Sequence, residues 1–161
     1  MSANRPERRL KLTVSYDGTA FHGWQVQPGL VTIQGELERV FAEMSRRPAN
    51  IAGSGRTDAG VHALAQVAAL TTEVPIPCYN VRYAMNRLLP GAIRVLAVEE
   101  VPLAFHPRFD ATAKRYEYRI HRGEICSPFE RPYVHHFPYP LDEERMLAAA
   151  GVYVEIGRAH V

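Results

Sequence analysis

The sequence predicts an α+β fold in which two helices pack on one face of an antiparallel sheet. One segment alternates apolar and polar residues, two segments repeat apolar residues with the helical period, and turn residues separate them. Between residues 10 and 101 the predicted order is strand, helix, strand, strand, helix, strand. That order is typical of the ferredoxin-like (RRM-like) fold, which leaves the second face of its sheet available for a partner.

The first strand and the first helix are predicted by their periods. Every second residue is apolar from Leu10 to Tyr16, and Asp17-Gly18 ends this strand. The helical stripe that follows consists of Ile33, Leu37, Val40, Phe41 and Met44. Thr32 is placed to cap this helix, and Pro48 lies just beyond its end. The spacing i, i+4, i+7, i+8, i+11 is that of a core-facing helix.

The second half of the predicted sheet repeats the pattern. Residues 61–70 form a largely apolar strand, and residues 93–98 form a short strand rich in branched side chains. Between them, Asn80 is placed to cap a helix that Pro90-Gly91 stops. The expected buried stripe of this helix is Val81, Met85, Leu88 and Leu89.

A glycine-rich loop, Gly53 to His62, joins two of the predicted strands and is the best candidate for a reactive site. It carries Arg56 and Asp58 two residues apart. A guanidinium beside a carboxylate favours the ionised acid, which suits a nucleophile or a base. The alternative is an Asx-turn between strands, with Arg56 and Asp58 forming a surface ion pair.

The decapeptide Gly-Ser-Gly-Arg-Thr-Asp-Ala-Gly-Val-His at 53–62 resembles the signature of the TruA-type tRNA pseudouridine synthases. In that family the aspartate of Gly-Arg-Thr-Asp-x-Gly-Val-His is catalytic, which implies this role for Asp58. Residues 21–27 resemble the family's Phe-x-Gly-Trp-Gln-x-Gln element. Phe21 and Trp24 could instead be anchors that pack this loop into the core.

A second resemblance covers residues 105–121, where alternating residues from Thr112 to His121 predict a strand that opens a second domain. The family has Phe-x-x-Arg-Phe here, followed by Arg-Tyr-x-Tyr, and its first tyrosine lies against the target base. That implies a base-stacking role for Tyr116. The alternative, a tyrosine in a cross-strand pair, is the expectation for Tyr118.

The resemblance implies isomerisation of uridine to pseudouridine at positions 38 to 40 of the tRNA anticodon stem-loop, without metal or organic cofactor. Asp58 would be catalytic, and Arg56 would neutralise phosphate or hold the space of the flipped base. The full-length enzyme would be a homodimer. Two rivals are a non-catalytic RNA-binding module on the same sheet and a small hydrolase using Asp58, for which no partner carboxylate has persuasive spacing.

Composition limits the class of protein. Nineteen Lys and Arg against seventeen Asp and Glu give a formal charge of +2, so the clustering of the basic residues matters more than their total. Cys78 and Cys126 form no Cys-x-x-Cys motif, and no secretory or membrane-spanning run is present, which favours the cytoplasm. The adjacent His135-His136 does not provide a metal geometry, so no metal site is expected.

The resemblance divides the chain at residues 104 and 105. We expect residues 1–104 to form the ferredoxin-like domain with the catalytic loop, and residues 105–154 to be the truncated start of a second, similar domain. A helix is expected from Asp142 to Ala150. Residues 155–161 look like a translated sequencing adapter and are expected to be non-native. The chain is therefore an N-terminal fragment that we expect to be inactive alone.

Overall fold

The computed structural model describes residues 6–153, and the expected non-native tail at 155–161 lies outside the described residues. The chain forms two compact units, one up to Lys114 and one from Arg115. The domains 1–104 and 105–154 remain predictions. Among the described residues, no helix has the length and apolar character needed to cross a membrane.

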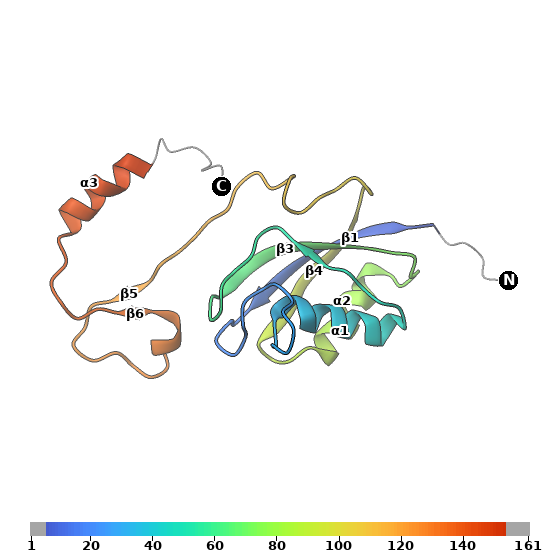
Figure 1. Cartoon of the computed structure of the whole chain (residues 1–161), viewed down its shortest axis with the longest axis horizontal. Helices are drawn as coiled ribbons and strands as arrows, with labels where there is room; N and C mark the ends of the chain where they lie inside the picture. The colour runs from blue at the N-terminus through green and yellow to red at the C-terminus, as the bar shows by residue number, and fades with distance from the viewer. Residues whose placement is uncertain (1–5, 154–161) are drawn as a thin grey trace. The chain divides into compact units, whose positions relative to one another are not determined.

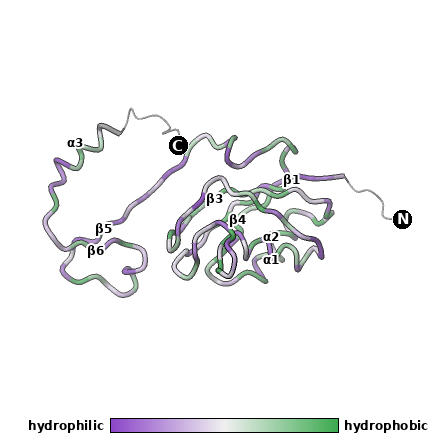
Figure 2. The backbone as a smooth tube through the Cα atoms, in the orientation of Figure 1, coloured by the Kyte–Doolittle hydropathy of each residue, from purple (hydrophilic) through white to green (hydrophobic). Residues whose placement is uncertain are grey.

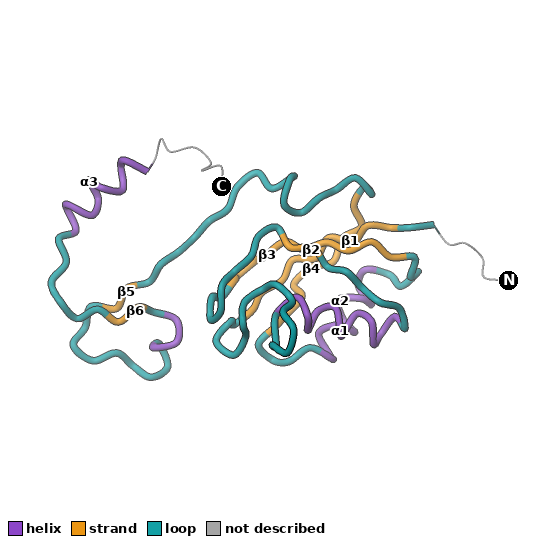
Figure 3. Tube along the Cα trace, viewed as in Figure 1, coloured by secondary structure: helices purple, strands orange, loops and turns teal. Residues whose placement is uncertain are grey.

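The first unit is an α+β sandwich of one sheet and two helices. Its elements are β1 (Arg8–Tyr16), α1 (Ile33–Ser45), β2 (Ala52–Gly53), β3 (Ala63–Thr72), α2 (Cys78–Leu88) and β4 (Ile93–Val101). The sheet order is β2-β3-β1-β4 and each neighbouring pair is antiparallel. Helices α1 and α2 cover one face of this sheet (Figures 1 and 3). The predicted element order is confirmed, and the topology is compatible with a ferredoxin-like fold.

The core lies between the sheet and the helices because each element has one apolar face. In β1 the buried residues are Leu10, Leu12, Val14 and Tyr16. Leu12 pairs with Ala68 of β3 and with Val98 of β4, so central β1 carries the inner face of the sheet. Figure 2 shows hydrophobic and hydrophilic residues interleaved along these elements, as a two-layer fold requires.

The helix starts differ in how well the sequence predicted them. The Thr32 hydroxyl accepts a hydrogen bond from Gly35 N at 3.2 Å, which confirms this cap. The Asn80 cap is wrong, because α2 begins at Cys78 after Pro77, which provides no side-chain cap. The Pro77 carbonyl accepts the first helical hydrogen bond, from Val81 N at 3.0 Å, so α2 starts there without a side-chain cap. Leu88, expected to be buried, is 40% exposed.

The second unit contains short elements only. Strands β5 (Ile120–His121) and β6 (His135–His136) pair in parallel, followed by α3 (Glu143–Tyr153), and Asp142 caps α3 through a 3.0 Å hydrogen bond from Arg145 N. A 3₁₀ turn, η1 (Arg131–Tyr133), precedes β6. The strand predicted over residues 112–121 is wrong except for its last two residues, which pair with β6. Alternation alone makes no strand without a pairing partner, and β6 offers only two residues.

Trp24 links the residue 17–24 loop to the core. Its ring is 2% exposed and belongs to the main core cluster, which confirms the anchor expected for this residue. A Cβ placed on Gly53 would lie 2.6 Å from Trp24 Cε2 and 2.7 Å from Trp24 Nε1. Only glycine therefore lets β2 pass this close to the indole.

We expect Gly53→Ala to lower the free energy of unfolding by about 1–3 kcal/mol, because the added methyl group overpacks the site and displaces the Trp24 ring. Urea unfolding of the 161-residue chain followed by tryptophan fluorescence measures this, since Trp24 is its one tryptophan. Gly91→Ala is the matched control, because a Cβ there meets nothing nearer than Arg94 at 3.8 Å. Equal stability of the two variants would contradict the prediction.

Candidate active site

The loop from Gly53 to His62 connects β2 with β3 and turns sharply at Asp58. Ser54 N donates to Val67 O at 2.8 Å, which extends the pairing of the two strands into the loop. Val61 N donates to Asp58 O at 3.2 Å, and Gly60 between them has φ +78°. A positive φ at the third position is typical of a type II turn and favours glycine. Asp58 therefore begins a tight turn at the end of the sheet.

A second loop, residues 17–24, holds this turn through the main chain. Trp24 N donates to Thr57 O at 2.9 Å, and Gly60 N donates to Phe21 O at 3.2 Å. Gly23 has φ +83°, and a Cβ there would lie 2.6 Å from Thr57 O. The two segments that resemble family motifs thus bind each other on both sides of Asp58.

Side chains beneath the loop complete this support. Tyr16 is buried, and its hydroxyl lies 2.9 Å from Thr57 Oγ1. Burial raises the pKa of Tyr16, and the Thr57 hydrogen bond offsets this only in part. His62 Nδ1 lies 3.1 Å from Asp17 Oδ1 and 3.1 Å from Gly18 N, so His62 ties the loop end to the end of β1.

Arg56 and Asp58 are both exposed, whereas Thr57 between them is half-buried. No ion pair joins Arg56 to Asp58 among the residues that the structure describes, so the surface ion-pair alternative lacks support. Alternation along the loop turns both charged side chains toward solvent while Thr57 anchors the backbone. The Asp58 carboxylate is therefore accessible to a ligand.

A pocket of about 400 Å³ adjoins this loop. Its lining residues are Trp24, Gln25, Gln34, Asn50, Ile51, Ala52, Gly53, Gly55, Arg56, Arg108 and Lys114. Three of them are cations and three are amides, and none is acidic. No period or motif of the sequence predicted that Arg108 and Lys114 line the same pocket as Arg56.

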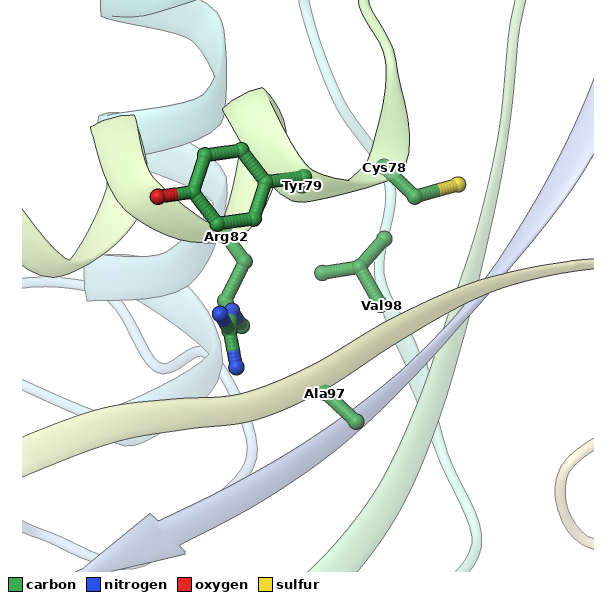
Figure 4. A pocket seen from close by; sticks show the side chains of 5 residues that line it. All are labelled: Cys78, Tyr79, Arg82, Ala97 and Val98. Carbon is green, nitrogen blue, oxygen red and sulfur yellow. The ribbon is translucent and has the colours of Figure 1, made fainter.

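A smaller pocket of about 240 Å³ lies between α2 and β4 (Figure 4). Tyr79 and Arg82 project from α2, with Arg82 pointing toward β4, and Ala97 and Val98 of β4 complete the lining. Arg82 donates to Leu96 O at 3.3 Å and lies over the Tyr79 ring, so its guanidinium already has partners in the chain. This pocket contains no residue of the loop that carries Asp58.

Tyr116 belongs to the second unit, where its side chain is 71% exposed in an irregular stretch. Tyr118 is 89% exposed and lies outside the strands, so the cross-strand pair expected for it is not present. The structure thus leaves Arg56 and Asp58 exposed on one loop, while the base-stacking role of Tyr116 stays a prediction.

One group in the second unit has the residue types of a cation site. Ligand atoms of His121, Cys126 and Glu130 lie within 4.8 Å of one another. However, the His121 ring nitrogens lie 3.1 Å from Ile125 O and 3.7 Å from a Glu130 oxygen, respectively. These contacts do not decide for or against an ion, and exposed acidic groups such as Glu130 are common without one, so the group alone provides no argument for a metal function.

Comparison with known proteins identifies the family. The model of a tRNA pseudouridine synthase family matches residues 12–110, which include both braced loops. A tRNA pseudouridine synthase A from Solibacter usitatus is 65% identical over 143 residues, covering 89% of this chain and 60% of that protein. Proteins of the same name from Bacillus pumilus and Citrifermentans bemidjiense are 47% and 46% identical, over 89% and 91% of this chain and 59% of each relative.

The chain therefore spans about 60% of the length of the curated relatives that it matches. The family match covers more than half of the chain, and it includes β1 from Leu12 onward, the other three strands, both helices of the first unit and the loop that carries Asp58. On this evidence the chain belongs to the tRNA pseudouridine synthase family.

Proposed function

We propose that this chain is the N-terminal part of an enzyme that isomerises uridine to pseudouridine at positions 38 to 40 of the tRNA anticodon stem-loop, with Asp58 as the catalytic carboxylate. The observation that carries the proposal is an exposed carboxylate on a loop held by main-chain hydrogen bonds from Trp24 and Gly60. Its relatives are named tRNA pseudouridine synthases, which supplies the substrate class and the reaction.

The reaction moves the uracil base within one nucleotide. The N1–C1′ bond breaks, the base rotates, and a C5–C1′ bond forms, while the hydrogen on C5 leaves and N1 gains one. Asp58 can assist by adding to the ring or sugar, or by accepting the C2′ proton. The target nucleotide must leave the base stack to reach the carboxylate. A braced loop suits this task because its position does not depend on the RNA.

Two further residues would handle the flipped nucleotide. Arg56 would neutralise a nearby phosphate or hold the space that the base has left, since its guanidinium is exposed two residues from Asp58. Tyr116 would stack on the base, and its exposed ring leaves a face available for this contact. Both residues would act without a metal or organic cofactor.

The proposal includes the rest of the protein. Residues 1–104 would form the catalytic-loop domain, and residues 105–154 would begin a second, similar domain, in keeping with the greater length of the relatives. The complete enzyme would be a cytoplasmic homodimer. The two cysteines of the described chain are both unpaired, which fits a reducing compartment.

Asp58→Asn in the full-length protein is expected to abolish isomerisation while tRNA affinity stays within about tenfold, because one carboxylate contributes little to a polyanion interface. Pseudouridine formation on an unmodified tRNA transcript and filter binding measure the two effects. Glu43→Gln on α1 removes one exposed charge elsewhere on the unit and should keep full activity.

Isomerisation by Asp58→Asn near the wild-type rate would refute the catalytic assignment. Binding of tRNA by the wild-type protein without any isomerisation would instead favour the non-catalytic RNA module.

Tyr116→Ala should reduce isomerisation more than Tyr116→Phe does, because phenylalanine keeps the stacking surface and loses only the hydroxyl. Single-turnover kinetics on the same transcript compare the two variants. Tyr118 is the matched position, since it is also an exposed tyrosine of the second unit. Equal losses from Tyr116→Ala and Tyr118→Ala would remove the special role of Tyr116.

A further inference from the structure

We propose that Arg108 and Lys114, together with Arg56, form a phosphate clamp for the RNA strand next to the target uridine. This inference rests on the proposed function and adds two positioning residues to it. The clamp is the acid-free pocket of about 400 Å³ beside the loop that carries Asp58.

The first argument is that the three cations of this pocket have no ion-pair or hydrogen-bond partner among residues 6–153. Elsewhere Arg8, Arg39 and Arg47 pair with carboxylates, and Arg9 and Arg94 donate to main-chain oxygens. In the described part of the chain, the side chains of Arg56, Arg108 and Lys114 make no ion pair or hydrogen bond. Three unpaired cations around one cavity repel one another, so an anionic ligand that enters the pocket relieves this repulsion.

The second argument is that the loop backbone makes room for one of these cations. A Cβ added to Gly55 would lie 3.1 Å from Lys114 Nζ, so the ammonium group lies against the glycine of the loop itself. Arg56 follows Gly55 directly, and Arg108 lines the same cavity. Residues that are more than 50 positions apart in the sequence thus line one pocket beside the loop.

The third argument concerns which anion fits. Two residues of extended chain span at most about 7 Å, which limits the backbone distance from Arg56 to Asp58. Phosphates along one nucleic-acid strand are about 3.4 Å apart in rise, so this distance corresponds to one or two nucleotides. A phosphodiester adjoining a uridine at Asp58 would therefore reach the pocket. Gln25 and Asn50 add exposed amides, which can bond to ribose hydroxyls or base edges.

An acidic peptide could also satisfy three cations. The position of the pocket on the loop that carries Asp58 favours the RNA strand, because that strand must pass this loop for the reaction to occur. The clamp would hold the strand while Asp58 acts, so Arg108 and Lys114 would contribute to substrate positioning and not to bond making.

The test uses the full-length protein with Arg108→Gln, Lys114→Gln and the double variant, and an anticodon stem-loop RNA as the probe. We expect each single variant to raise Kd about five- to tenfold and the salt slope to fall by roughly 0.7 per cation, as for a phosphate contact on single-stranded nucleic acid. KM should rise more than kcat falls. Arg82→Gln is the matched control, because it removes an arginine from the other pocket (Figure 4).

Charge-conserving variants separate clamping from folding. Arg108→Lys and Lys114→Arg should keep the salt slope of RNA binding. Arg108→Lys should nevertheless lose RNA affinity if the planar guanidinium of Arg108 binds a phosphate through two hydrogen bonds. Thermal melting should be unchanged in all of them. If the glutamine variants and these charge-conserving variants all lost RNA binding together with a fall in melting temperature, Arg108 and Lys114 would have a structural role. That result would overturn the clamp.

The remaining outcomes distinguish the clamp from the proposed function. If the double variant and Arg82→Gln had the same RNA affinity and the same salt slope, that outcome would overturn the clamp even if the wild-type protein isomerises uridine. Loss of RNA binding in the double variant, with a wild-type protein that binds but does not isomerise, would support the clamp and refute the function. A change in self-association without a change in RNA binding would assign the pocket to a protein partner and also overturn the clamp.

Discussion

The main-chain contact between the residue 17–24 loop and the residue 53–62 loop is the constraint on which the candidate site depends. Two hydrogen bonds, Trp24 N to Thr57 O and Gly60 N to Phe21 O, bracket Asp58 from both sides. Such close approach requires glycine, because a Cβ on Gly18 would lie 2.0 Å from Val61 O. The sheet supports this contact, since the first loop leaves β1 and the second joins β2 to β3.

The order of elements in the first unit was predictable because each element has its own local signal. The alternation of β1 and the stripe of α1 both describe residues that face one core, and Thr32 is a cap that acts within three residues. Local signals failed where tertiary pairing decides. The alternating residues 112–119 form no strand, because a strand needs a partner and the described chain pairs only Ile120 and His121 with β6.

The candidate site was predictable only in part. Asp58 and Arg56 were found through the resemblance of one decapeptide, and their exposure fits a ligand site. Tyr16 gave no such signal, because its place in an alternating strand explains it fully, yet its hydroxyl supports Thr57. Lys114 lies against Gly55 and Arg108 lines the same pocket because of how the chain folds back after β4, which no sequence period records.

The position of the basic residues matters more for RNA binding than the net charge of the chain. The formal net charge of +2 provides little long-range attraction for RNA, but an acid-free pocket with three cations produces a strong local field. Asp58 lies in solvent beside that field, so the first unit supplies its position but not its enclosure. A bound RNA strand that occupies the pocket would neutralise the cations and cover the loop at the same time. Binding of the RNA backbone would then also exclude water from the Asp58 carboxylate.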